Sequence, residues 1–182
     1  MTGRCERTGS RRIARAQGAR RVRPMFQTIL IGYDGRERGG EATALAEVLR
    51  DPYQGTLLLT SAYPQDPRMV GGFGVSDEIE ELGDETKQML AEAREALPEP
   101  ARVQIRAVPS DSPARALSEV AAAEHADLIV VGSSRRSALG RQLPGTTAER
   151  LLRDAPCTVA VAPRGYSGGD IRRIGVAYDG SR

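Results

Sequence analysis

The stretch TILIGYDGR, residues 28–36, is an apolar run rich in β-forming residues that ends in an Asp-Gly turn. A run without polar alternation is typical of a strand that is covered on both faces of a parallel sheet. The segment that follows, residues 41–50, places Ala42, Leu45 and Leu49 on one helical face. A covered strand followed by an amphipathic helix predicts the start of an α/β fold.

The same alternation continues along the chain. The pattern predicts strands at residues 28–34, 56–63, 102–108, 126–132 and 157–163. It predicts helices at residues 41–50, at about 77–97, from Pro113 onward and at about 146–153. Strands and helices in this order predict a doubly wound, Rossmann-like α/β fold, in which five parallel strands form a sheet with helices on both faces.

The composition argues against several classes of function. No apolar run approaches the roughly 20 residues that span a bilayer, so we expect no membrane association. Cys5 and Cys157 are the only cysteines, and His125 is the only histidine. The composition therefore argues against a disulfide framework, a zinc site and a Ser-His-Asp triad. We expect a reduced, cytoplasmic protein with no metal site and no catalytic residue.

Residues 1–24 form an Arg-rich extension. Eight arginines and one glutamate fall in residues 1–25, although the whole chain has a net charge of only +2. An arm of this kind could bind nucleic acid or anionic lipid. Lys87 is the only lysine, so arginine is preferred throughout the chain and its abundance here is weak evidence. We expect a disordered extension, and nucleic acid is an unlikely partner. Met25 directly precedes the first strand, so an early-assigned start and a real N-terminal extension both stay open.

The first strand is repeated near the end of the chain. RIGVAYDGS, residues 173–181, repeats the pattern of residues 28–36, an apolar strand that ends in Tyr-Asp-Gly, and Tyr-Asp-Gly recurs 145 positions later. The repeat predicts one complete domain at residues 25–165. Residues 166–182 would then be a linker and the first strand of a truncated second domain.

Three strand ends could together form a ligand site, because ligands of doubly wound sheets lie beyond the carboxyl ends of the strands. Asp34, Ala62 and Gly132 lie at such ends. The carboxylate of Asp34 could accept hydrogen bonds from ribose hydroxyls, or it could serve in a turn or cap the next helix. Tyr33 and Tyr63 could flank a base, although packing is the commoner role.

The loop GSSRRSALGRQLPGTTAERLL, residues 132–152, has the parts of a phosphate-binding loop. Gly132 and Gly145 would allow backbone amides to approach a phosphate, and Thr146 stands where a helix N-terminus favours an anion. However, Thr146 and Glu149 also match the T-x-x-E capping box, which would use the hydroxyl within the helix. The residues alone leave both readings open.

This loop, preceded by ILIGYDG and followed by APCTVAVAP, resembles the universal stress protein family over residues 25–165. The repeated strand is similar to the tandem two-domain members of that family. Nucleotide-binding members have the pattern G-x2-G-x9-G-[ST] after the fourth strand. Gly132 matches its first position and Gly145-Thr146 its last pair, whereas Arg135 replaces the second glycine.

The resemblance implies a strand order of 3-2-1-4-5 and a site for ATP or another adenine nucleotide at the strand 1/strand 4 switch point. Residues expected near adenine and ribose are Gly32, Tyr33, Asp34 and Ala62. Residues expected near the phosphates are Gly132, Arg135, Gly145, Thr146 and Thr147, with any Mg2+ held mainly through the phosphates. Arg135 could pair with phosphate, or it could block the loop and leave a dimerising module that binds no nucleotide.

The resemblance also implies a regulatory stress-response protein rather than a dedicated enzyme, with ATP hydrolysis at most slow. It further implies a homodimer that forms through the fifth strand, residues 157–163.

Overall fold

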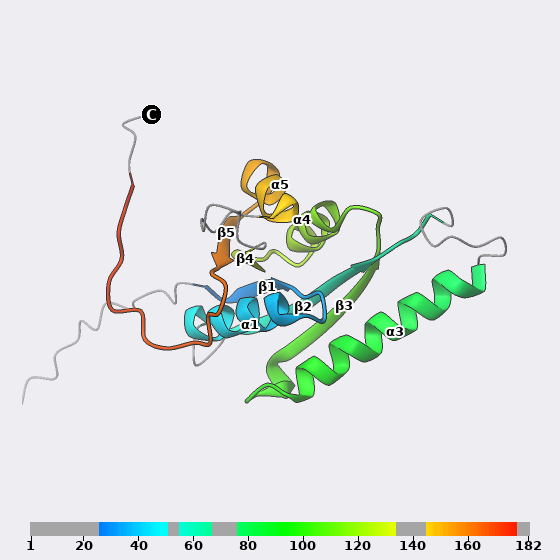
Figure 1. Ribbon diagram of the computed structural model, residues 1–182, viewed down its shortest axis with the longest axis horizontal. Helices are drawn as coiled ribbons and strands as arrows, with labels where there is room; N and C mark the ends of the chain where they lie inside the picture. Colours follow the sequence, from blue (N-terminus) through cyan, green and yellow to red (C-terminus); the bar gives the residue numbers. More distant parts are fainter. Residues whose placement is uncertain (1–25, 51–54, 67–75, 134–144, 178–182) are drawn as a thin grey trace, which may run out of the picture.

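The computed structural model describes residues 26–50, 55–66, 76–133 and 145–177 (Figure 1). The strands are β1 (Thr28–Gly32), β2 (Thr56–Tyr63), β3 (Val103–Pro109), β4 (Leu128–Gly132) and β5 (Thr158–Ala162). The helices are α1 (Glu37–Leu49), α3 (Ser76–Glu95), α4 (Pro113–Ala123) and α5 (Thr146–Asp154), with a short 3-10 helix at Pro100–Arg102. The N-terminal extension, Arg135 and Asp179 lie outside the described residues.

The strands form one parallel sheet in the order β3-β2-β1-β4-β5, which confirms the predicted fold class and strand order. β1 is central, and its Ile29 pairs with Leu57 of β2 on one side and Leu128 of β4 on the other. β3 and β5 are the edge strands. The chain winds outward from β1 in two directions, so the ends of β1 and β4 meet at the point where the winding reverses.

Helices cover both faces of the sheet, as the uninterrupted apolar run of β1 predicts. Ile29 and Ile31 pack on the face that is covered by α1 and α3 (Figure 1). Leu30 between them packs on the opposite face with α4 and α5. All three side chains are fully buried, and truncation of such a residue to alanine typically costs about 2–5 kcal/mol of stability.

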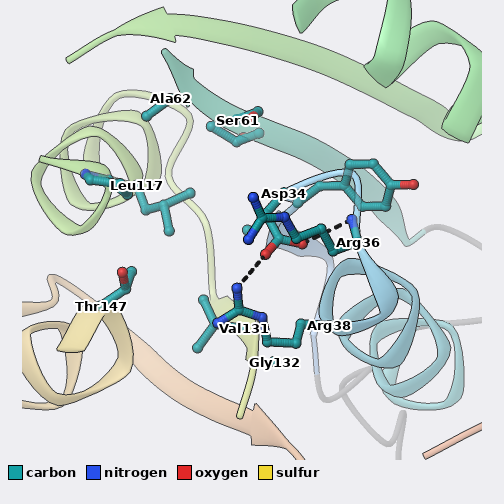
Figure 2. A pocket seen from close by; sticks show the side chains of 13 residues that line it. Asp34, Arg36, Arg38, Ser61, Ala62, Leu117, Val131, Gly132 and Thr147 are labelled. Carbon is teal, nitrogen blue, oxygen red and sulfur yellow. Dashed lines mark hydrogen bonds and ion pairs between the residues drawn. The ribbon is translucent and has the colours of Figure 1, made fainter. Parts of the chain in front are cut away.

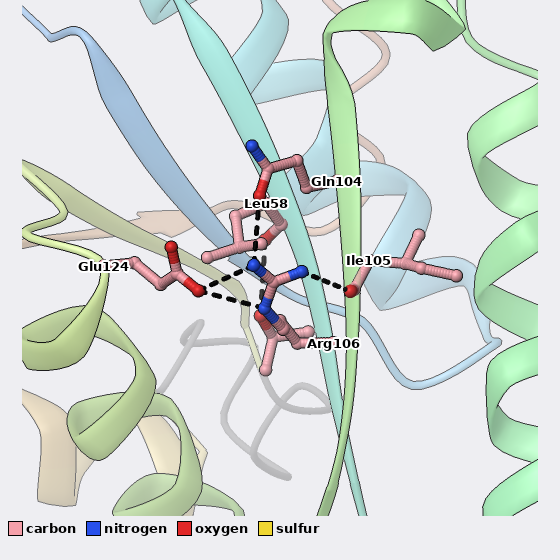
Figure 3. Close-up of polar contacts among 6 residues, drawn as sticks. Leu58, Gln104, Ile105, Arg106 and Glu124 are labelled. Carbon is pink, nitrogen blue, oxygen red and sulfur yellow. Dashed lines mark hydrogen bonds and ion pairs between the residues drawn. The ribbon is translucent and has the colours of Figure 1, made fainter.

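Edge strand β3 carries a polar network on its α4 side. Figure 3 shows the guanidinium of Arg106 directed toward Glu124, which follows α4. Arg106 also donates to the Ile105 carbonyl oxygen at 2.9 Å and to Oε1 of Gln104 at 3.1 Å. The network joins this edge strand to the end of the neighbouring helix α4.

Helix α4 ends in a Schellman motif. His125 has φ of +52°, and its N–H points to the carbonyl of Ala122 while the N–H of Ala126 donates to Ala121 at 2.9 Å. These two contacts satisfy carbonyl groups that the last helical turn leaves free. The single histidine thus occupies a left-handed position that favours glycine.

The chain turns back onto α1 after β5. The N–H of Tyr166 donates to the Pro163 carbonyl at 3.1 Å, and the N–H of Gly165 donates to Oε1 of Glu41 on α1. Glu41 is buried. Residues 167–177 form neither a helix nor a strand. The second-domain strand inferred from the repeat therefore stays a prediction.

No helix within the described ranges combines the length and the apolar character needed to cross a membrane.

Candidate functional site

A pocket of about 360 Å³ opens at the carboxyl ends of β1, β2 and β4, where the winding of the sheet reverses (Figure 2). Its lining includes residues that the sequence singled out: Gly32, Tyr33, Asp34, Ala62, Gly132 and Thr147. Residues separated by more than 100 positions in the chain thus meet at one place. The volume lies within the range of small-molecule sites, which is about 300–1,000 Å³.

Gly132 is needed for the packing of helix α1 against the end of β4. A Cβ at this position would overlap the carbonyl oxygen of Arg38 and lie 2.8 Å from the Cβ of Arg38. The absence of a side chain therefore lets the first turn of α1 rest on the strand end. This steric role is independent of any phosphate, and it was not apparent from the sequence.

Asp34 fixes the turn between β1 and α1. Its Oδ1 accepts a hydrogen bond from the backbone N–H of Arg36 at 3.1 Å, and its Oδ2 lies 3.1 Å from Nη2 of Arg38. Gly35, between Asp34 and Arg36, has a φ of +69°, a backbone conformation that suits glycine. The N-cap of α1 is Arg36, so Asp34 serves in the turn and the helix-cap alternative was wrong.

Two tyrosines beside the strand ends pack on glycines. A Cβ on Gly39 of α1 would lie 2.6 Å from the Tyr33 ring, and one on Gly83 of α3 would lie 3.2 Å from the Tyr63 ring. Tyr33 also donates its backbone N–H to Thr60 at 2.9 Å. Helix packing therefore accounts for both rings, although Tyr33 still contributes to the pocket wall.

Helix α5 starts one residue earlier than a capping box requires. Gly145 is the N-cap and Thr146 is the first helical residue, so Thr146 and Glu149 do not have the N-cap and N3 spacing. The capping-box alternative was therefore wrong. Within the described ranges, Thr147 lines the pocket whereas Gly145 and Thr146 do not.

The pocket also contains residues that sequence reasoning missed. Arg36 and Arg38 come from the start of α1, and Pro113 and Leu117 come from α4. The arginines could have been found from their positions two and four residues after Asp34, where a strand gives way to a helix. Leu117 lies on the buried face of α4, and its proximity to the site depends on how α4 crosses the sheet.

The arrangement suits an anionic ligand with an apolar part. Ala62, Pro113 and Leu117 provide apolar surface, whereas Asp34, Arg38 and Thr147 provide a carboxylate, a guanidinium and a hydroxyl (Figure 2). The guanidinium of Arg36 has no partner among the described residues and adds a second positive charge. No cluster of three or more His, Cys, Asp or Glu residues able to hold a metal ion occurs in the part of the chain that the structure describes.

Comparison with known proteins gives consistent matches. The model described as "Universal stress protein family" matches residues 25–163. A Thermus aquaticus protein, "Universal stress protein in QAH/OAS sulfhydrylase 3'region", is 29% identical over 142 residues, which cover 74% of this chain and 97% of that protein.

Two solved structures share the fold. A universal stress protein family member from Burkholderia pseudomallei has a TM-score of 0.57 at 23% identity, and the match covers 75% of this chain and 96% of that one. A family member from Arabidopsis thaliana, solved with AMP bound, has a TM-score of 0.53 at 11% identity. That match covers 76% of this chain and 92% of the Arabidopsis chain.

Proposed function

Since this chain belongs to the universal stress protein family, we propose that it is a stress-response regulatory domain which binds ATP or another adenine nucleotide in the pocket between β1 and β4. The observation that carries the proposal is the convergence of Asp34, Gly132 and Thr147 on one pocket at the switch point. Doubly wound sheets bind their ligands at this place.

The described residues fit the parts of such a ligand. Adenine would lie against the apolar surface of Ala62, Pro113 and Leu117. Asp34 would accept hydrogen bonds from the ribose hydroxyls, because a carboxylate is an acceptor only. Thr147, in the first turn of α5, would donate to a phosphate near the positive end of the helix dipole. Arg135, Gly145 and Thr146 remain proposed phosphate contacts.

The Arabidopsis family member with AMP bound supports this choice of ligand, because its chain shares the fold over 92% of its length. Any Mg2+ would be held mainly through the phosphates of ATP.

Calorimetric titration of the full chain with ATP, AMP and GTP tests the proposal. We expect ATP and AMP to bind and GTP to bind less tightly. Ala62→Phe should fill the adenine end and abolish the heat of binding. Ala122→Phe is the matched control, because Ala122 is exposed on α4 away from the pocket lining and the variant should bind as the wild type does. Equal loss in both variants, or no heat from the wild type, contradicts the proposal.

We propose a binding role rather than a dedicated catalytic one, with ATP turnover at most slow. Release of phosphate from Mg-ATP, measured over hours, checks this. Multiple turnovers per second that Asp34→Asn abolishes would contradict it.

A homodimer is the second part of the proposal. β5 is an edge strand whose residues Val159 and Val161 stay partly exposed, and an edge strand can pair with its counterpart in a second copy. Sedimentation equilibrium should give twice the chain mass, and a monomer at all concentrations would rule the dimer out. Suppose that the dimer forms, that the wild type binds no nucleotide and that Arg135→Gly does bind it. The chain is then a dimerising module in which Arg135 prevents nucleotide binding.

A further inference from the structure

The side chain of Arg38 lies in the pocket, although neither the fold nor the β1–α1 turn requires it to be there. The packing of α1 on β4 uses the backbone of Arg38 against Gly132, and the β1–α1 turn uses the backbone N–H of Arg36. The Arg38 guanidinium is directed into the pocket and contacts Oδ2 of Asp34 (Figure 2). The guanidinium is thus available for a further role.

The ion pair between Arg38 and Asp34 is easily exchanged for another partner. The two side chains are 42% and 41% exposed, and they are four residues apart in the chain. Water screens such pairs, and they contribute little to stability. A phosphate offers several charged acceptor oxygens, with which a guanidinium forms strong two-point hydrogen bonds.

The position of Arg38 places a phosphate within reach. Its backbone rests on Gly132, where the predicted phosphate-binding loop begins, and Thr147 at the start of α5 lines the same pocket. Figure 2 shows Arg38 and Asp34 on one side of the pocket and Thr147 on the other. A ligand phosphate between Thr147 and the end of β4 would lie beside the guanidinium.

We propose that Arg38 is a phosphate-binding residue which leaves Asp34 when a nucleotide binds, so that Oδ2 of Asp34 becomes free for a ribose hydroxyl. This inference rests on the proposed adenine-nucleotide function and adds a specificity rule to it. The phosphate and the ribose hydroxyls of one ligand are then recognised together. The site discriminates against unphosphorylated nucleosides, because adenosine leaves Arg38 on Asp34.

The ratio of the affinities for AMP and adenosine tests the inference, measured by calorimetry on the full chain. We expect AMP to bind at least about tenfold more tightly than adenosine, the effect of one charge-assisted hydrogen bond. Arg38→Gln should reduce this ratio severalfold while adenosine affinity is kept or raised. Arg38→Lys, which keeps the charge, should restore part of the ratio. Arg153→Gln removes the same charge from an exposed position outside the pocket lining and should leave the ratio unchanged.

Asp34→Asn should move the same ratio in the opposite direction. The asparagine oxygen can still accept from the Arg36 N–H, so the turn is retained, but Arg38 no longer has to leave a carboxylate. We expect weaker adenosine binding and a larger ratio. In the Arg38→Gln background the same change should raise the ratio less, because the released arginine is already missing.

The outcomes separate the two proposals. Suppose that the wild type binds AMP, and that Arg38→Gln unfolds in a normal thermal transition and keeps the full ratio of AMP to adenosine affinity. The role of Arg38 is then refuted while the proposed function stands. An equal response to Asp34→Asn with and without Arg38 also refutes the exchange. If the wild type binds neither AMP nor ATP, the proposed function itself fails.

Discussion

The guanidinium of Arg106 on edge strand β3 contacts a single oxygen of Glu124 at the end of α4, with Nη2 at 2.7 Å and Nε at 3.0 Å. The pair joins two elements that are adjacent in the chain but lie in different layers (Figure 3). About 40% of the Arg106 side chain and 35% of the Glu124 side chain is exposed, so water weakens the attraction.

We therefore expect a modest coupling free energy. A double-mutant cycle with Arg106→Gln and Glu124→Gln, measured by urea unfolding, should give about 0.5–1 kcal/mol. The pair Lys87–Asp84, which lies on the solvent side of α3 with both side chains more than 60% exposed, should give less. A coupling near zero for Arg106 and Glu124 would show that the network in Figure 3 does not stabilise the edge strand.

His125→Gly should stabilise the protein. His125 has φ of +52° at the end of α4, and a side chain in the left-handed region costs about 1–2 kcal/mol relative to glycine. Part of that gain is lost because glycine makes the unfolded chain more flexible. We expect the free energy of unfolding to rise by about 0.5–1 kcal/mol in urea titrations. His125→Ala is the control and should show no such gain.

Gly132→Ala and Gly40→Ala should act in opposite directions. A Cβ at Gly132 overlaps the backbone of Arg38, whereas one at Gly40 in α1 meets no atom within 4 Å. We expect the first change to cost about 1–3 kcal/mol by overpacking and the second to stabilise by up to about 1 kcal/mol, because alanine favours a helix. Thermal unfolding of both variants checks this. Equal effects would contradict the steric role of Gly132.

Cys157 should react slowly with alkylating reagents. Burial raises the pKa of the Cys157 thiol above its usual range, and the Asp127 carboxylate adds to the shift, while a backbone hydrogen bond involving Ile129 opposes it. Because the thiolate is the reactive form, iodoacetamide should modify folded Cys5→Ser protein at pH 8 more slowly than the urea-unfolded chain. The rate in the folded protein should rise with pH and level off at a higher pH than the rate in the unfolded chain does.

The same shift has a consequence for stability. The folded state retains the thiol proton to a higher pH than the unfolded state does, so the thiol's contribution is fully present below the unfolded pKa of roughly 8.5. It decreases as the pH rises through the folded pKa. Equal alkylation rates in folded and unfolded chains at pH 8 would show that Cys157 is not shielded.

Much of the fold could be predicted because it depends on local patterns. The apolar run around Leu30 required cover on both faces, and Pro113 marked where a helix begins. Alternation of strands and helices was sufficient for a parallel sheet. The strand order came from the family resemblance, since hydrophobic patterns do not specify which strands are neighbours.

The site was less predictable because it depends on the register of helix ends and on contacts between distant elements. A difference of one residue at the start of α5 removed the capping box at Thr146. The side chain of Arg38 reaches the pocket only because α1 starts at Glu37 and rests on Gly132. The ring of Tyr33 lies on Gly39 because of the same start of α1. No short sequence pattern specifies these contacts between the helix and the strand end.

The contact between Gly132 and the backbone of Arg38 changes how relatives of this chain can be interpreted. The steric need for glycine at this position comes from the packing of α1 on β4, whether or not a ligand is present. A lineage that no longer used a nucleotide would keep the glycine, while substitutions would accumulate first at Asp34, Arg38 and Thr147. A glycine at this position in a relative would therefore report on the fold, whereas the side chains around it would report on binding.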